Sequence, residues 1–247
     1  MNRHIKENYI PLKTSDLGEN HKLVLVLTPE QGLIRTAVFG VKGKKGGSKR
    51  VLIQPFSLCR GDFYYDPVKK LWRLDEGECL ESRDTYHQHL NRYYGALFWA
   101  DLIIQSHAGG GSREFFQISA DYFRALDTEE SSRIPLIFLK TIWIYLGFEG
   151  IRPDLSACSR CGRKAPDTRA VCYSPEGQVI CSDCRMHSLP VLSGPARDLL
   201  LDNFQKAAEL SAGTAQELAS YLLSILKSLF RIRMDENSLK IILKTDL

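Results

Sequence analysis

The sequence contains no run of apolar residues near the ~20 that a helix needs to cross a bilayer. Residues 1–8 also lack the apolar core of a secretion signal. These two absences predict a cytoplasmic protein that does not enter a membrane. In that compartment the seven cysteines favour free thiols and metal ligands over disulfides.

Motifs of catalysis are missing as well. There is no nucleotide-binding G-x-x-x-x-G-K-[ST], no G-x-S-x-G, no H-E-x-x-H and no paired-carboxylate pattern. The six histidines form no recognisable catalytic constellation. The sequence therefore predicts a protein that is not an enzyme.

Acidic residues are absent from 31–61, a segment that holds seven lysines and arginines. Residues 1–80 carry 14 basic against 9 acidic side chains, whereas the rest of the chain carries 19 against 20. All of the excess positive charge therefore lies in the first third of the sequence. Because the excess positive charge is confined to residues 1–80, we expect these residues to bind a polyanion.

The centre of this segment is a loop rich in glycine and lysine. Residues 40–50 hold five cations and four glycines, but no helix is expected after them, so they do not match a phosphate-binding loop. The loop predicts a flexible finger that follows a nucleic-acid backbone and gains affinity through counterion release. A solvated loop without a ligand is the alternative. Aromatic residues on the flanking strands could stack on bases where they are exposed, although most are expected in the core: Phe39, Phe56, Tyr64, Tyr65 and Trp72.

The first 80 residues have the pattern of β structure, with short apolar or alternating runs bounded by turn residues. The expected strands cover 9–12, 21–28, 32–41, 56–65 and 71–79. Five short strands and one long loop favour a small closed barrel such as an OB-fold, with an SH3-like barrel as the alternative.

From Ser82 onward the apolar period becomes helical. One long helix is expected to bury a single stripe of side chains: Tyr86, Leu90, Tyr93, Leu97, Ala100 and Ile104. Further helices are expected at 114–126 with Ser112 as N-cap, from Ser131 to 147, at 196–204 capped by Ser193, and at 215–234 capped by Thr214. The predicted fold class is α+β, with an OB-fold barrel at 1–80 and a helical domain at 81–247.

Four cysteines have the spacing of a structural zinc site. Cys158-x-x-Cys161 and Cys181-x-x-Cys184 are separated by nineteen residues, and each CxxC turn can present two thiolates to one tetrahedral ion. Between them a β-hairpin is expected around the turn at Pro175. The pattern predicts a zinc ribbon over 156–187, inserted in the helical domain, with one structural zinc per chain.

Such an all-thiolate site has no open position for water, so it would brace the fold and not catalyse. A thioredoxin-like CxxC with coincidental cysteines is the weaker alternative, because neither pair follows a strand and opens a helix. His187 could replace one cysteine as a ligand. Cys59, Cys79 and Cys172 are expected to be buried apolar side chains.

Taken in order along the chain, several short segments resemble the bacterial recombination mediator family RecO. Those in the first part are DLGEN (16–20), LTPEQG (27–32), VFGV (38–41) and QPFS (54–57). Those in the second part are CSRCG (158–162), YSPEG (173–177) and CSDC (181–184). Each segment alone is weak, but their order, with a ribbon inside a helical domain behind a barrel, is specific.

The resemblance implies a bacterial protein at the nucleoid that binds single- and double-stranded DNA and anneals complementary strands. It also implies that the protein works with RecR to load RecA onto strands coated by single-strand-binding protein, whose acidic C-terminal tail contacts the helical domain. The implied DNA contacts are Arg35, Lys42, Lys44, Lys45, Lys49 and Arg50. The implied zinc ligands are Cys158, Cys161, Cys181 and Cys184, although the zinc site varies in this family. Candidate tail contacts are Lys140, Lys227, Arg231 and Arg233.

Two rival functions fit parts of the same pattern. One is a nuclease or metalloenzyme in which the ribbon supports an unrecognised site. The other is a scaffold whose barrel binds an acidic protein and never touches nucleic acid.

Overall fold

The computed structural model describes residues 3–42, 47–84, 86–106, 110–165, 170–185, 188–230 and 236–243, apart from the side chains of Ser48 and His87. The chain divides into two compact units, residues 1–128 and 129–247. No helix within the described ranges combines the length and apolarity that crossing a bilayer requires.

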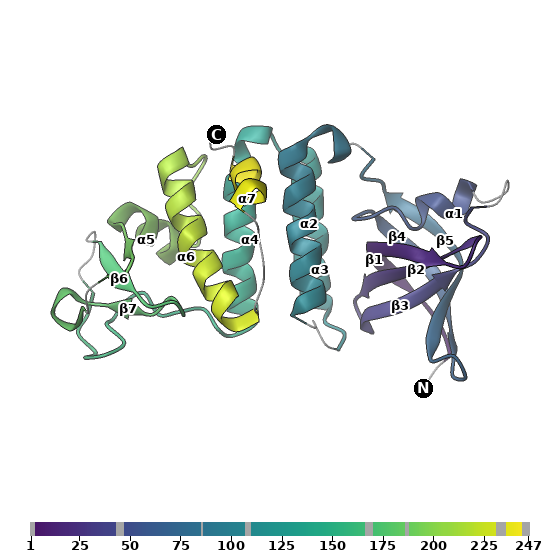
Figure 1. The fold of residues 1–247 in the computed structure, drawn as a ribbon, viewed down its shortest axis with the longest axis horizontal. Coiled ribbons are helices and arrows are strands. Elements are labelled where there is room, and N and C mark those ends of the chain that lie inside the picture. The colour runs from purple at the N-terminus through teal and green to yellow at the C-terminus, as the bar shows by residue number, and fades with distance from the viewer. Residues whose placement is uncertain are drawn as a thin grey trace. The chain divides into compact units, whose positions relative to one another are not determined.

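Five strands of the first unit close into a barrel in the order β1-β2-β3-β5-β4 (Figure 1). They are β1 (His4–Leu17), β2 (His21–Thr28), β3 (Gly32–Val38), β4 (Leu58–Asp66) and β5 (Leu71–Glu81). Neighbours are antiparallel except β3 and β5, which run parallel, and β1 pairs with β4 to complete the closure. This arrangement, with the short helix α1 (Gly47–Val51) between β3 and β4, confirms the predicted OB-fold over an SH3-like barrel.

Large apolar side chains fill the barrel. Tyr9, with no exposed surface, packs edge to face on Phe63 with 5.1 Å between ring centroids. Its hydroxyl donates to the carbonyl of Leu52 at 2.9 Å, which ties the segment after α1 to the barrel wall. A Cβ on Gly61 would lie 2.5 Å from Leu74, so the wall has room only for glycine there.

Several strand limits differ from those expected. The first strand extends from His4 to Leu17, well beyond the expected 9–12, because pairing with two neighbours carries its polar ends into the sheet. The third strand ends at Val38, so Phe39 lies outside it. The short helix α1 was not expected, and it replaces residues 47–50 of the predicted flexible loop with helix. At five residues it is too short to form a phosphate site.

Two helices complete the first unit, α2 (Leu90–Gln105) and α3 (Arg113–Thr128), after a 3-10 turn at Tyr86–Gln88. The Ser112 hydroxyl accepts the N–H of Phe115 at 3.1 Å, which confirms the predicted cap. The predicted stripe is wrong, because Leu90 is 61% exposed and Tyr93 is 38% exposed. Residues 96–103 of α2 are apolar on more than one face, so the sequence period alone did not identify the face that packs.

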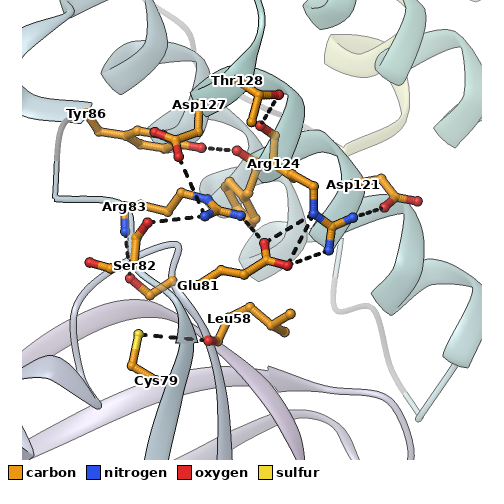
Figure 2. Close-up of polar contacts among 12 residues, drawn as sticks. Leu58, Cys79, Glu81, Ser82, Arg83, Tyr86, Asp121, Arg124, Asp127 and Thr128 are labelled. Carbon is orange, nitrogen blue, oxygen red and sulfur yellow. Dashed lines mark hydrogen bonds and ion pairs between the residues drawn. The ribbon is translucent and has the colours of Figure 1, made fainter.

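The barrel and this helical hairpin are joined by polar and aromatic contacts. Figure 2 shows Glu81, at the end of β5, between the guanidinium groups of Arg83 and Arg124. Arg124 Nη2 lies 2.8 Å from a Glu81 carboxylate oxygen. Beside them the buried ring of Phe56 stacks on Phe123 with 5.2 Å between centroids. The first compact unit therefore includes α2 and α3 with the barrel.

Four helices and a small sheet form the second unit. The helices are α4 (Ile134–Phe148), α5 (Gly194–Leu201), α6 (Ala212–Phe230) and α7 (Glu236–Leu243), with a 3-10 turn at Ser131–Arg133 before α4. The sheet has the order β7-β6-β8, from β6 (Val171–Tyr173), β7 (Val179–Ile180) and β8 (Val191–Leu192). The predicted hairpin is β6 and β7, whereas β8 and α7 were not expected.

Helix caps in this unit give one confirmation and one correction. The Ser193 hydroxyl accepts the N–H of Ala196 at 3.3 Å, as predicted. The helix expected to begin after Thr214 begins earlier, because Ser211 Oγ accepts the Thr214 N–H at 3.2 Å and acts as the cap. Two hydroxyls three residues apart were equally good candidates by sequence. Residues 231–234 of the expected helix lie outside the described residues.

Candidate metal centre and nucleic-acid interface

The four predicted cysteines come together in the second unit. Their sulfur atoms all lie within 4.8 Å of one another, and Cys161 Sγ is 3.7 Å from Cys181 Sγ. A tetrahedral zinc with Zn–S bonds of about 2.3 Å would space its thiolates about 3.8 Å apart. This is the one group of metal-ligating side chains found among the described residues, and it could bind a metal ion.

Backbone turns present these sulfur atoms. The Gly162 N–H donates to the Cys158 carbonyl at 2.9 Å, and Gly162 takes a φ of 72°, which closes the first turn. The Cys184 N–H donates to the Cys181 carbonyl at 3.1 Å in the second turn, a 3-10 helix at Ser182–Cys184. An ion pair between Arg163 and Asp183 joins the two turns.

Hydrogen bonds inside the cluster favour a thiolate at Cys158. The Cys181 N–H donates to Cys158 Sγ at 3.3 Å, and this donor leads the lowering of the Cys158 pKa to about 6. Hydrogen bonding with Cys161 and then Cys181 raises the pKa of Cys184 to about 12. A thiolate is the form that binds metal, so the backbone prepares Cys158 as a ligand.

The ribbon is anchored on helix α6 of its own unit. The Tyr221 hydroxyl donates to the Gly177 carbonyl at 2.7 Å, and the Tyr221 ring meets Tyr173 edge to face. Gly177 has a φ of 81°, and a Cβ there would lie 2.5 Å from Ile225. The fully buried Arg197 of α5 donates to the Leu155 carbonyl at 2.8 Å, just before the first cysteine turn.

The other cysteines lie apart from this cluster. Cys59 and Cys172 are buried, as predicted, and Cys79 is half-buried. His187, the alternative ligand, lies outside the described residues.

The predicted DNA-binding residues lie around the end of β3. Arg35 is exposed on that strand, and Lys42 is exposed beyond its end. Lys49 and Arg50 belong to α1, whereas Lys44 and Lys45 lie outside the described residues. The structure thus places Lys49 and Arg50 beside the segment that follows β3, with Arg35 in the middle of that strand. Their role in binding stays a prediction.

Lys42, Lys49 and Arg50 already have partners. Lys42 and Lys22 both contact the Asp16 carboxylate, at 2.6 and 2.9 Å, and their hydrogen bonds hold the Asp16 pKa at about 2. Lys49 Nζ donates to the Phe39 carbonyl at 3.0 Å, and Arg50 Nε donates to the Val41 carbonyl at 3.3 Å. The ion pairs are exposed, where they are worth little, so a phosphate could replace Asp16 as partner of Lys42 at small cost.

A groove of about 400 Å³ lies between α6 and α7 in the second unit. Leu223, Leu239 and Leu243 supply its apolar surface, and Lys227 and Lys240 lie on its lining. Of the candidate tail contacts, Lys227 thus lies on a groove, Lys140 is half-buried on α4, and Arg231 and Arg233 lie outside the described residues. Lys240 was missed because α7 was not expected.

The barrel, the helical unit and the four-thiol ribbon define a class of OB-fold proteins with an appended metal-ligand cluster. The family model described as "Recombination protein O N terminal" matches residues 1–83, and that described as "Recombination protein O C terminal" matches residues 87–245. The chain therefore belongs to the RecO family, as the sequence resemblance predicted. Helices α2 and α3 fall within the second match, although they pack in the first compact unit.

Curated relatives carry the name "DNA repair protein RecO". The protein of Desulforamulus reducens is 26% identical over 76% of this chain and 71% of its own length. That of Clostridium acetobutylicum is 28% identical over 72% and 71%, and that of Bacillus pumilus 29% identical over 65% and 61%. Family membership gives the chain a role in DNA repair and recombination.

Proposed function

We propose that this protein is a non-catalytic recombination mediator in the bacterial cytoplasm, acting at the nucleoid. It binds single- and double-stranded DNA, anneals complementary strands, and with RecR helps to load RecA onto strands coated by single-strand-binding protein. The observation that carries the proposal is the family match along both halves of the chain, joined to an OB-fold barrel whose acid-free segment 31–61 is strongly basic. A mediator must hold strands without reading sequence, which calls for contacts to phosphates.

The proposed DNA contacts are Arg35, Lys42, Lys44, Lys45, Lys49 and Arg50. The four cysteines hold one structural zinc, because the distances between their sulfur atoms suit a tetrahedral zinc ion. Four thiolate ligands leave the metal no open position for catalysis. Zinc stabilises the fold of the ribbon, and no step of annealing passes through it.

Strand annealing is the test of the whole proposal. We expect the pure protein to accelerate duplex formation between labelled complementary strands, and to leave single strands intact with or without magnesium. Cleavage would favour the nuclease, and strands that are neither bound nor annealed would favour the scaffold. Both outcomes would overturn the mediator.

A charge variant tests the proposed surface. Replacing Lys44 and Lys45 with Ala should weaken single-strand binding and reduce the slope of log affinity against log salt by about 1.4, since each lost phosphate contact removes about 0.7. The control replaces Lys164 and Lys206, two exposed lysines of the second unit, with Ala. Equal slopes for both variants would show that the DNA lies elsewhere.

The groove between α6 and α7 is the proposed seat of the acidic tail of single-strand-binding protein. Its leucines can take apolar side chains, while Lys227 and Lys240 offer charge to carboxylates. A labelled acidic peptide should bind about ten times more weakly to Lys227→Glu than to wild type, and Lys206→Glu should match wild type. Unchanged binding in Lys227→Glu would remove this groove from the proposal.

A further inference from the structure

A shallow pocket lies on the barrel where the chain leaves β3 and the β4–β5 hairpin turns back. Ala37, Phe39, Tyr64, Lys69, Trp72 and Arg73 line it, together with Asp66 and Leu71. Its volume is about 50 Å³, against the roughly 300 Å³ or more of sites that enclose a small molecule. A ligand of this pocket must therefore rest on its surface, as a flat ring does.

Phe39 provides an exposed ring at the rim. Of the eleven phenylalanines in the chain, all within the described residues, only Phe39 is exposed, at 36%. Its ring contacts His21 with 4.8 Å between centroids and 69° between planes. Since Phe39 follows the end of β3, its side chain is not held in the barrel core. The buried Ala37 and Trp72 form a rigid floor beside it.

The other ring of the rim is fixed in place. Tyr64 lies between His4, at 4.8 Å between centroids, and the guanidinium carbon of Arg73, at 5.2 Å from the ring centre. Arg73 is in turn held by Asp75. Stacking on Phe39 is therefore the contact that the pocket leaves open to a ligand.

Cations surround this ring. Lys49 Nζ donates to the carbonyl of Phe39 itself at 3.0 Å, and the exposed Lys69 and Arg73 also line the pocket. The proposed phosphate-binding residues thus lie next to an exposed aromatic ring, the combination that single-strand-binding surfaces use. An unpaired base can use both the ring and the charge.

We propose that the Phe39 pocket receives one unstacked nucleobase of a single strand whose phosphates contact Lys42, Lys49 and Arg50. This inference rests on the proposed function and adds a base contact to it. A base inside a duplex is stacked on both faces and cannot enter, so the pocket favours single strands over duplexes. Stacking is tolerant of sequence, which suits a mediator.

The test compares three probes of equal length: an oligothymidine strand, the same sugar–phosphate chain without bases, and a duplex. Phe39→Ala should bind oligothymidine about 5- to 150-fold more weakly than wild type, the range of one base–aromatic stack. Its affinity for the abasic chain and its salt slope should equal those of wild type, because the phosphate contacts remain. Phe39→Trp should restore binding, and Tyr93→Ala, which removes a similarly exposed ring on α2, should behave as wild type.

Failure of this inference is distinct from failure of the proposed function. If wild type binds oligothymidine and Phe39→Ala binds it equally well, the base pocket is wrong while the mediator stands. An equal loss on the abasic chain would also overturn it, since the ring would then act through the loop. If wild type binds none of the probes at low salt, both ideas fall. An acidic peptide serves as a fourth probe. If Phe39→Ala weakens binding of that peptide alone, the ring serves a protein partner and the inference is overturned.

Discussion

The barrel of the first unit and the ribbon of the second are held together by different means. The barrel has strands of 7 to 14 residues that close on themselves around buried rings such as Tyr9 and Phe63. The ribbon has strands of two and three residues, too short to form a sheet that is stable alone. Its two cysteine turns meet at their sulfur atoms, at one exposed ion pair and at a hydrogen bond from Arg160 to the Cys184 carbonyl. The barrel can therefore fold on apolar burial, whereas the ribbon needs a metal or its helix.

Removing the metal ligand should give the largest difference between the two regions. Cys158→Ser should lose zinc and destabilise the second unit by several kcal/mol, since zinc binding is worth about 10–16 kcal/mol in zinc-finger peptides. The barrel should keep its stability. Metal analysis and thermal unfolding would measure this, with Cys79→Ser as the control at less than about 1 kcal/mol. A zinc-free wild type of equal stability would contradict it.

The contact between the ribbon and α6 should give the next largest effect. Gly177→Ala forces a Cβ against Ile225 and a side chain into a φ of 81°, so we expect a loss of about 2–4 kcal/mol. Denaturant unfolding would measure it. Gly213→Ala is the matched control on α6, where a Cβ meets nothing within 4 Å; there the change should be neutral or stabilising by up to about 1 kcal/mol. Equal effects of the two substitutions would show that the ribbon is not seated on α6.

The ion pairs of Figure 2 should give the smallest effect, and one that depends on pH. The Arg124 guanidinium leads the lowering of the Glu81 pKa below its usual 4.5. A carboxyl whose pKa is lower in the folded state than in the unfolded state contributes its full stabilisation above the unfolded-state pKa. That contribution to stability is lost as the pH falls through the folded-state pKa. Glu81→Gln should therefore cost about 1 kcal/mol at pH 7, and the difference from wild type should shrink below about pH 4.5.

Asp121→Asn is the matched control for that pair, because Asp121 also contacts Arg124 but is 56% exposed. Its effect should be smaller than that of Glu81→Gln at every pH. Equal unfolding curves for wild type and Glu81→Gln at pH 7 would show that this contact does not hold the barrel to its helices.

The sequence was most informative where function depends on local spacing. Two CxxC turns predicted the cysteine cluster because each pair sets its own geometry, and the structure needs only to bring two turns together. Strand alternation predicted the barrel for a similar reason. The DNA contacts are different, because they depend on where a charged side chain lies in three dimensions and on what else it touches, as the Asp16 pairing of Lys42 shows.

Long-range packing was the part that sequence could not give. Leu90 and Tyr93 are apolar at helical spacing, yet both are exposed. The third strand of the ribbon, Val191–Leu192, is two residues long and exists only because β6 lies beside it. Helix α7 forms a groove with α6. It was not predicted because its eight residues show no distinct apolar period.

The stacked rings of Phe56 and Phe123 have a practical meaning for anyone who wishes to study the barrel in isolation. A fragment ending where the first family match ends, at residue 83, would strip α3 away and leave the Phe56 ring, now only 3% exposed, facing water. Such a fragment invites aggregation. A fragment that ends at Thr128 instead keeps α3, whose Phe123 ring stacks on Phe56.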